Sequence, residues 1–479
     1  MSKWDVEDVY ESGVFSELAF TCSVLEGWIK PEVRDSVINE LDRRILVPFE
    51  RDLKDYSSRK LESGKDLCSW LESRQDWNAV GIANILYTIL AIDGDLRRIA
   101  SLIVGCEEVL DDYFGTFEHD GYISSGMRHW NYGLSHFVLL AERLLMATNG
   151  VVDLYGSKQV RDVVRFPLNT RISSVVSHSG EGDSVVSAFP LFGSNKNPVP
   201  SEGLLWNILG VRFGLEGGRY KVEDSGGNVF WDLSLCSLYP SRLISSIDPV
   251  DGRRCYYGSS GMLISRNKGA SISMTSIGGN NLKEDGHCQI GAYTLFDSGS
   301  AVFGTQGGLV YSRDTIFQER FSFSLNSSFG HPVPLVDGQM QNVLPSAKGM
   351  VLKAELSDGM DIIEYDLKSA YNVHGLLFLN RRISFARTGK MRMEVTDNYM
   401  ADRPISFETA LVVPGFSKTS GALITSGRFR VRVVNDSETS IERVYFLDPG
   451  GSEGVVGRYG VKLKERRNEG SVTYVIEEI

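Results

Sequence analysis

The chain has 479 residues, 42% of them hydrophobic, so it is long enough for two or more domains that each bury a core. Its 61 acidic and 50 basic residues give a net charge of -11, which excludes a global basic field that would attract nucleic acid or an anionic membrane. Any binding of an acidic polymer must therefore use a local basic patch.

The cysteine spacing does not indicate an oxidising compartment, and the N-terminal residues do not indicate export. The six cysteines are scattered without a C-x-x-C pair, which predicts reduced core thiols rather than a zinc knuckle or a disulfide framework. The opening residues MSKWDVEDVYESGVF lack the features of a signal peptide, and no run approaches the ~18 apolar residues of a membrane span. We expect a soluble, cytoplasmic protein from the sequence as written, or an envelope or secreted protein if a leader precedes it.

The first half of the chain has helical periodicity. From about Phe15 to Phe213, apolar residues recur at the spacing of one helix face, in segments joined by short loops. The clearest are FSELAFTCSVLEGWI, VRDSVINELDRRILVPFE, NAVGIANILYTILAI, LRRIASLIVGCEEVLDDYF, LSHFVLLAERLLMATNG and SEGLLWNILGVRFG. Several are apolar on more than one face, which suits helices sandwiched in a stacked or ring-like array.

The second half has strand periodicity. From about Tyr256, short segments alternate polar and apolar residues between turns rich in Gly, Ser, Asn and Asp. They include GMLISRN, ASISMTSI, AYTLF, FSFSL, MVLKAEL, RISFART, MRMEVTD, ISFETALVV, FRVRVVN and SVTYVIEEI. Ten or more such strands predict an antiparallel β-sandwich. The expected organisation is α+β and multidomain: a helical domain over 1–225, a connection over 226–254, and a β-sandwich over 255–479.

Two patches in the helical half carry more polar and aromatic residues than packing requires. In SRQDWNAVG, Asp76 precedes an apolar helix, where it can be a helix N-cap or part of a site. The second patch, EHDGYISSGMRHWNYGLSHF, is expected to be a loop before the next helix. Aromatic rings interleaved with hydrogen-bonding side chains suit a sugar cleft, because a pyranose has an apolar face and a rim of hydroxyls. Alternatively, Trp130 and Tyr132 anchor the start of a helix in the core.

Two patches in the β half each contain a histidine beside a strand. They are GGNNLKEDGHCQIGAYTLFDSG, with His287, and SSFGHPVPLVDGQMQ, with His331. Because they are far apart in the sequence, only the fold can bring them together as metal ligands. The common nucleotide-binding, serine-hydrolase and zincin motifs are absent. With 61 acidic residues, the sequence cannot single out the pair of carboxylates that a glycosidase would need.

Together the patches resemble the heparinase II/III-like family of polysaccharide lyases. The resemblance covers roughly Phe15 to Val433 and rests on RQDWNAV, RHWNYG, GGNNLKEDGHCQIGAY, TQGGLVYSRDTIFQERF, SFGHPVPLVDGQMQ and LNRRISFARTGKMRMEVTDNY. It implies an N-terminal α/α toroid (an incomplete helical barrel) followed by an antiparallel β-sandwich. It also implies β-elimination at a uronic acid, which needs a donor to offset the carboxylate, a base and an acid.

The family's catalytic positions carry other residues in this chain. The carboxylate-contacting Asn falls at or beside Asp76, the catalytic Tyr on His129, and the catalytic His on Asp285. The resemblance then implies His129 and Tyr132 as base or acid, with Arg128 and Asn78 on the carboxylate. Further residues complete this set of expectations, with Asp285 and Tyr311 as catalytic and Asp76, Trp77, Trp130, Asn131 and Arg313 as substrate-binding.

The resemblance also implies a metal site. His287 and His331 match the family's two His ligands, whereas its Asp ligand falls on Thr305. Zinc held by two imidazoles and water would be weakly bound, since structural sites normally close with four protein ligands. Asp285 can complete the set; otherwise the two histidines hydrogen-bond to the backbone.

Three functions follow from these observations. The first is a lyase of an acidic, uronate-containing polysaccharide or oligosaccharide, with an altered catalytic site. The second is a non-catalytic glycan-binding or assembly protein on the same fold, favoured by the changes at Asp76, His129, Asp285 and Thr305. The third is a hydrolase that recruited Asp76 and Asp285 as paired carboxylates. Neither a nucleic-acid partner nor a membrane span is expected.

Overall fold

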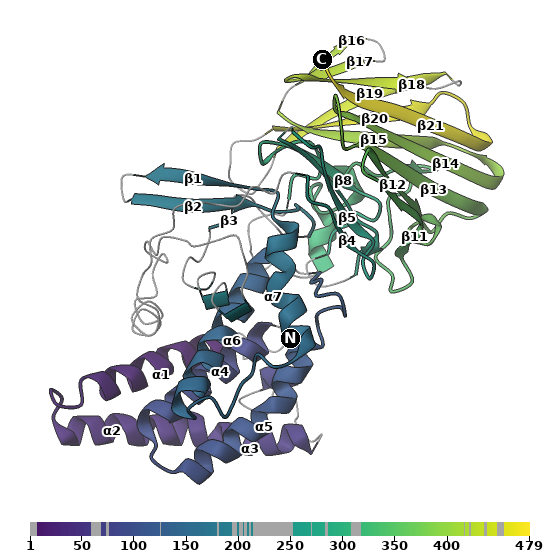
Figure 1. Ribbon diagram of the computed structural model, residues 1–479. Coiled ribbons are helices and arrows are strands. Elements are labelled where there is room, and N and C mark those ends of the chain that lie inside the picture. Colours follow the sequence, from purple (N-terminus) through teal and green to yellow (C-terminus); the bar gives the residue numbers. More distant parts are fainter. Residues whose placement is uncertain are drawn as a thin grey trace. The chain divides into compact units, whose positions relative to one another are not determined.

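The protein is described here by a computed structural model (Figure 1). It describes residues 7–58, 69–72, 76–124, 126–179, 182–193, 199–200, 205, 208–209, 212–213, 252–269, 271–282, 286–307, 318–415, 417–420, 423–434, 438–447 and 455–479. The chain divides into two compact units. The helical unit comprises Met1–Ile123, Arg128–Val164 and Glu202–Ser246, and the β unit comprises Ser124–Met127, Arg165–Ser201 and Ile247–Ile479.

The helices of the first half follow the predicted periodicity. They are α1 (Glu7–Val24), α2 (Pro31–Leu41), α3 (Val47–Ser57), α4 (Asp76–Ile92), α5 (Leu96–Phe114), α6 (Met127–Ala147) and α7 (Lys158–Thr170). A π-helical turn, Asp42–Leu46, joins α2 to α3, and a 3-10 turn, Ser69–Glu72, precedes α4. Helix α1 packs on α4, and α4 packs on α5. The start of α5 is explained by Asp95, whose Oδ1 accepts a hydrogen bond from the backbone N–H of Arg97 at 2.9 Å.

Helix α4 is buried on several faces, as its composition predicts. Nearly every residue from Asp76 to Ile89 is buried, including Asn84 and Thr88 among the polar ones. Thr88 Oγ1 donates to the carbonyl of Asn84 at 2.8 Å, and Asn84 Nδ2 donates to Ser12 Oγ of α1 at 3.1 Å. An all-round buried helix is what a central position between neighbouring helices requires.

The strands of the described residues form four antiparallel sheets. The five-stranded sheet has the order β4 (Cys255–Tyr257), β5 (Met262–Arg266), β6 (Ile272–Ser276), β8 (Tyr293–Asp297), β9 (Ser300–Gly304). The four-stranded sheet has the order β10 (Leu335–Val336), β15 (Phe407–Pro414), β20 (Val455–Leu463), β19 (Thr439–Leu447). The three-stranded sheet has the order β1 (Ser173–Ser179), β2 (Gly182–Ala188), β3 (Val199–Pro200).

The largest sheet of the described residues has nine strands. Its order is β16 (Lys418–Ser420), β17 (Leu423–Ser426), β18 (Phe429–Val434), β21 (Arg467–Glu478), β14 (Arg392–Ile405), β13 (Leu376–Ala386), β12 (Met360–Asp366), β11 (Lys348–Leu356), β7 (Gly279–Asn280). Alternate residues of β12 and β14 are buried, which is the period of two that the sequence predicts. Their buried side chains share one apolar core with residues of the five-stranded and four-stranded sheets. A helical first half followed by antiparallel sheets confirms the predicted α+β fold class.

Three local predictions were wrong. The stretch expected to be a loop up to Phe137 turns helical at Met127, the first residue of α6. FSFSL is not a strand: the 3-10 helix Gln318–Ser322 and turns occupy it, because only Leu325 and, in part, Phe323 need to reach the core. Within the expected helical half, β1 and β2 form an antiparallel hairpin.

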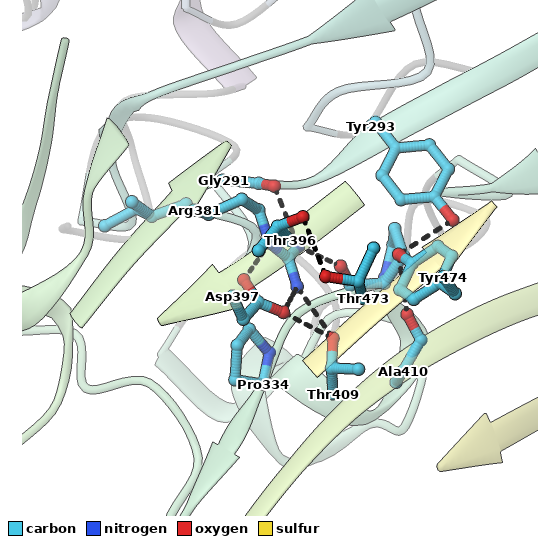
Figure 2. Close-up of polar contacts among 12 residues, drawn as sticks. Gly291, Tyr293, Pro334, Arg381, Thr396, Asp397, Thr409, Ala410, Thr473 and Tyr474 are labelled. Carbon is cyan, nitrogen blue, oxygen red and sulfur yellow. Dashed lines mark hydrogen bonds and ion pairs between the residues drawn. The ribbon is translucent and has the colours of Figure 1, made fainter. Parts of the chain in front are cut away.

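A buried ion pair anchors the core of the β unit, as Figure 2 shows. Arg381 and Asp397 have no exposed surface, and their two contacts, Nε to Oδ1 and Nη2 to Oδ2, are both 2.7 Å long. Arg381 also donates to the carbonyls of Gly291, at 3.0 Å, and Pro332. These acceptors lie shortly after His287 and His331, so one guanidinium fixes both histidine-bearing segments.

None of the helices among the described residues combines the length and apolar character needed to cross a membrane.

Candidate functional site

The first residues of α4 and α6 bring an aspartate and a histidine together in the helical unit. His129 Nδ1 lies 2.9 Å from Asp76 Oδ2. The Asp76 side chain is 6% exposed and that of His129 is 20% exposed, so the contact is sheltered while the ring retains access to solvent. An ionised carboxylate only accepts hydrogen bonds; Nδ1 therefore donates to Asp76, and Nε2 is the basic nitrogen of the neutral ring.

Gly133, one helical turn after His129, makes room for this pair. A Cβ at Gly133 would lie 2.6 Å from Tyr113 Oη and 2.8 Å from Asp76 Cβ. Only glycine therefore lets Tyr113 and Asp76 pack against α6 without displacement.

Two buried groups behind the pair stay neutral. Burial, with a further effect of the Asp76 charge, raises the pKa of Tyr113 well above its usual value. Burial lowers the pKa of His136 to about 4, and its Nδ1 donates to the carbonyl of Tyr132 at 2.9 Å. At neutral pH the titratable side chains around Asp76 thus include a protonated phenol and an unprotonated imidazole.

Two aromatic residues near Asp76 and His129 in the sequence contact each other. Trp77 and Tyr132 are partly exposed, and their rings meet edge to face with centroids 5.9 Å apart. The Tyr132 ring also contacts His136 edge to face at 5.1 Å. His129 contacts Asp76, Trp77 follows Asp76 in the chain, and Tyr132 contacts Trp77; the side chains of these three predicted site residues are partly exposed.

Three other predicted substrate-binding residues are buried. Asn78 has no exposed surface, and its Nδ2 donates to the carbonyls of Leu71 at 2.8 Å and Trp70 at 3.2 Å. Trp130 is also fully buried, with Nε1 donating to the Val163 carbonyl at 2.9 Å. Asn131 is 8% exposed. As placed, Trp130 anchors the start of α6, the alternative that the sequence left open, and Asn78 secures the turn before α4.

In the β unit the fold brings the two separated histidines together. The rings of His287 and His331 are 5.3 Å apart between centroids, and both residues are fully buried. Thr305 Oγ1 lies 3.1 Å from His331 Nδ1. Burial, followed by repulsion from His287 and Arg458, lowers the pKa of His331 well below its usual value. His331 is therefore a neutral imidazole whose Nδ1 is engaged by Thr305.

The described donors do not complete a zinc site. Zinc sites in proteins use three or four His, Cys, Asp or Glu ligands. Among the described residues no group of three or more such side chains is placed to hold a metal ion. Two imidazoles with Thr305 on one of them make a poor donor set, so no chemical step is assigned to a metal.

Several predicted residues lie outside the described part of the chain. Asp285, Tyr311 and Arg313 fall in the gaps at 283–285 and 308–317, and of Arg128 only the backbone, in the first turn of α6, is described. Their roles remain predictions. Tyr113 and Gly133 were missed; the signal for Gly133 was its position in WNYG, four residues after His129 on the same helix face.

The fold, a helical region followed by antiparallel sheets, is similar to the folds of solved heparinase III and heparan sulfate lyase structures. No protein-family model matches the sequence, and no curated protein matches it. Among solved structures, the heparinase III BT4657 gene product superposes with a TM-score of 0.63 at 12% identity over 97% of this chain and 66% of that chain. The heparan sulfate lyase HepC from Pedobacter heparinus gives 0.62 at 12% identity, over 97% and 68%.

A mutant of the same HepC gives a TM-score of 0.60 at 11% identity, over 91% of this chain and 63% of that chain. The chain thus spans about two thirds of the length of the structures it resembles. At such low identity the similarity establishes the fold.

Proposed function

We propose that this protein is a polysaccharide lyase that cleaves an acidic, uronate-containing glycan by β-elimination, with His129 as the base. The contact between His129 Nδ1 and Asp76 Oδ2 at 2.9 Å carries the proposal. A buried carboxylate that holds Nδ1 fixes the tautomer and makes Nε2 the basic nitrogen, which is the arrangement of a general base.

The chemistry assigns a separate role to each group. Nε2 of His129 removes the proton from the carbon next to the uronate carboxylate, and the electron pair forms an enolate-like state. That pair then forms the double bond to the neighbouring carbon, whose bond to the glycosidic oxygen breaks. The departing oxygen takes a proton from an acid, and the predicted acid is the hydroxyl of Tyr132, one turn after His129 on α6. Trp77, in edge contact with Tyr132, offers an apolar face to a sugar ring.

The decisive experiment measures the unsaturated product. The purified protein is incubated with a panel of uronate polymers, and the ultraviolet absorbance of the new double bond is followed. His129→Ala should lower the rate by about 10²- to 10⁴-fold, and Asp76→Asn by a smaller factor, since the base remains but its tautomer is released. His374→Ala, an exposed histidine of the β unit, is the matched control. Absence of the product across the panel would refute the lyase proposal.

One observation favours a second candidate, a glycan-binding protein without catalysis. The Asn78 amide, proposed to neutralise the uronate carboxylate, donates instead to the carbonyls of Trp70 and Leu71. The Asp76 carboxylate also repels an anionic sugar. Under this alternative, saccharides bind without product, and His129→Ala leaves their affinity unchanged.

A further inference from the structure

A cluster of cationic side chains gathers at one edge of the β unit. It is contributed by the residue after α7, the segment before β4, the end of β5 and the residues that follow β5 and β13. The members, called here the arginine cluster, are Arg171, Arg253, Arg254, Arg266, Lys268 and Arg387.

The inner members of the arginine cluster are bound to backbone carbonyls. Arg266 is 2% exposed; its Nη1 donates to the carbonyl of Arg253 at 2.9 Å and its Nη2 to that of Arg171 at 2.6 Å. Arg387 is 3% exposed and donates to the carbonyls of Gly252 and Ser357, the latter at 3.2 Å. Carbonyl groups satisfy hydrogen bonds but leave the positive charge of a guanidinium unmatched.

Acidic partners are scarce within the described residues. Asp361 is fully buried and pairs with Arg254, Nε to Oδ1 at 3.0 Å, and with Arg387, Nε to Oδ2 at 3.4 Å. Asp358, whose side chain is 95% exposed, lies 3.5 Å from Lys268 Nζ. No acid in the described ranges forms an ion pair with Arg266, and its Nε has no hydrogen-bond partner there.

The electrostatic surroundings of Arg266 agree with this excess of positive charge. Burial, then repulsion from Arg253, Arg171 and Arg387, lowers its pKa to about 10, with Cys255 acting in the opposite direction. Burial is the largest cause, and the repulsion from three arginines agrees with a local excess of positive charge.

We propose that the arginine cluster is an anion-binding subsite for the sulfate or carboxylate groups of an acidic glycan. Arg253 and Lys268 are exposed and Arg254 is partly exposed, so they can touch the ligand directly. The buried Arg266 and Arg387 hold the 252–254 segment from behind and add to its positive potential. Guanidinium groups bind planar oxyanions in a bidentate manner, which suits both ligand groups.

The overall charge of the chain makes this patch selective. With a net charge of -11 the protein repels polyanions in general, so an acidic glycan can bind only where cations are concentrated. The choice of a glycan over another polyanion rests on the proposed function; the excess of cations does not depend on it.

The test compares two double charge reversals in the full-length protein. Arg253→Glu with Lys268→Glu alters the arginine cluster, whereas Arg432→Glu with Lys464→Glu reverses two similarly exposed cations elsewhere in the β unit, whose side chains are 49% and 53% exposed. Equilibrium binding is measured with heparin, which is sulfated, with unsulfated polygalacturonate, with double-stranded DNA, and with neutral dextran. Circular dichroism checks the fold, and Arg253→Lys with Lys268→Arg preserves the charge.

The cluster reversal should weaken binding of heparin or polygalacturonate by about tenfold or more at physiological salt. It should also reduce the slope of log affinity against log salt by roughly one unit for each of the two lost cations. The control reversal and the charge-preserving variant should each stay within about twofold of the native protein. The polymer that loses more affinity identifies sulfate or carboxylate as the preferred group.

Three results would overturn the inference: no binding of either glycan by the native protein, equal loss in the control reversal, or tighter binding of DNA than of both glycans. Because binding is measured without turnover, a failed lyase assay and a failed binding assay remain distinct.

Discussion

Replacing Asp397 by Asn should strongly destabilise the β unit. The change keeps the side-chain shape but leaves Arg381, which has no exposed surface, without its counter-charge. The native pair has two contacts of 2.7 Å, and Asp397 Oδ2 also accepts a hydrogen bond from Thr409 Oγ1 at 2.5 Å. Removing one partner of a buried pair costs about 3–5 kcal/mol, since an uncompensated charge stays in a low-dielectric core.

The loss is read out as a shift in thermal unfolding. For a unit of this size about 3–5 kcal/mol corresponds to roughly 6–20 °C, measured by differential scanning calorimetry. The control is Glu438→Gln, which breaks the exposed pair of Glu438 and Lys464, whose side chains are 80% and 53% exposed. This change should leave the unfolding temperature close to that of the native protein. If Asp397→Asn costs no more than Glu438→Gln, the buried pair does not anchor the core as described.

The double variant Arg381→Met with Asp397→Leu separates charge from hydrogen bonding. A pair held by ionic contacts alone would be replaceable by apolar residues at little cost. Here Arg381 also serves the carbonyls of Gly291 and Pro332, which the apolar pair would leave unsatisfied. We expect the double variant to remain less stable than the native protein by about 1–3 kcal/mol for each carbonyl left buried without a donor. Native-like stability would show that these carbonyls find other donors.

Three further predictions concern the helical unit. Gly133→Ala should lower the free energy of unfolding, measured by urea titration, by about 1–3 kcal/mol, because the new Cβ would lie 2.8 Å from Asp76 Cβ. It should also abolish any His129-dependent activity. The control Gly94→Ala, whose Cβ would have no atom within 4 Å, should change stability by less than about 0.5 kcal/mol. Tyr113→Phe should leave stability in urea denaturation unchanged or raise it by up to about 1 kcal/mol, because the buried Tyr113 hydroxyl has no hydrogen-bond partner among the described residues. A clear loss of stability would show that the hydroxyl does have a partner. His136 has a pKa of about 4 when folded and about 6.5 when unfolded, so the unfolded chain binds the proton first as pH falls. Between pH 7 and pH 5 the free energy of unfolding of the native protein should therefore fall by up to about 2 kcal/mol more than that of His136→Gln. Equal falls in the two proteins would show that His136 is not shielded from solvent.

The sequence predicts the fold class well where one period dominates. The bounds of α5 match its apolar pattern, and the alternating burial of β14 matches MRMEVTD. It fails where the pattern is ambiguous: β1 and β2 are built from Ser and Val repeats that flank the sequence GEG, and they follow the helical segments of the first half. Local periodicity cannot decide whether such a repeat pairs with itself.

The candidate site is predictable only in part, because its contacts are tertiary. Asp76 and His129 were both selected from the sequence, but their hydrogen bond depends on how α4 and α6 pack. Trp130 was selected for its residue type, yet the position after His129 on a helix points toward Val163 and the core. Residue type indicates what a side chain can do, whereas its face on the helix decides whether a ligand can reach it.

The two units alternate along the chain, so neither is synthesised completely before the other begins. The helical unit includes Glu202–Ser246, which comes after a segment of the β unit. Within it, Arg212 forms an ion pair with the buried Glu142, Nε to Oε1 at 2.7 Å, and the Phe213 ring meets Tyr155 edge to face. A nascent chain that ends near residue 170 therefore lacks part of its first unit, and folding of that unit on the ribosome must wait for residues made much later. For the same reason, truncating the chain at any single position does not yield either unit whole and separate from the other.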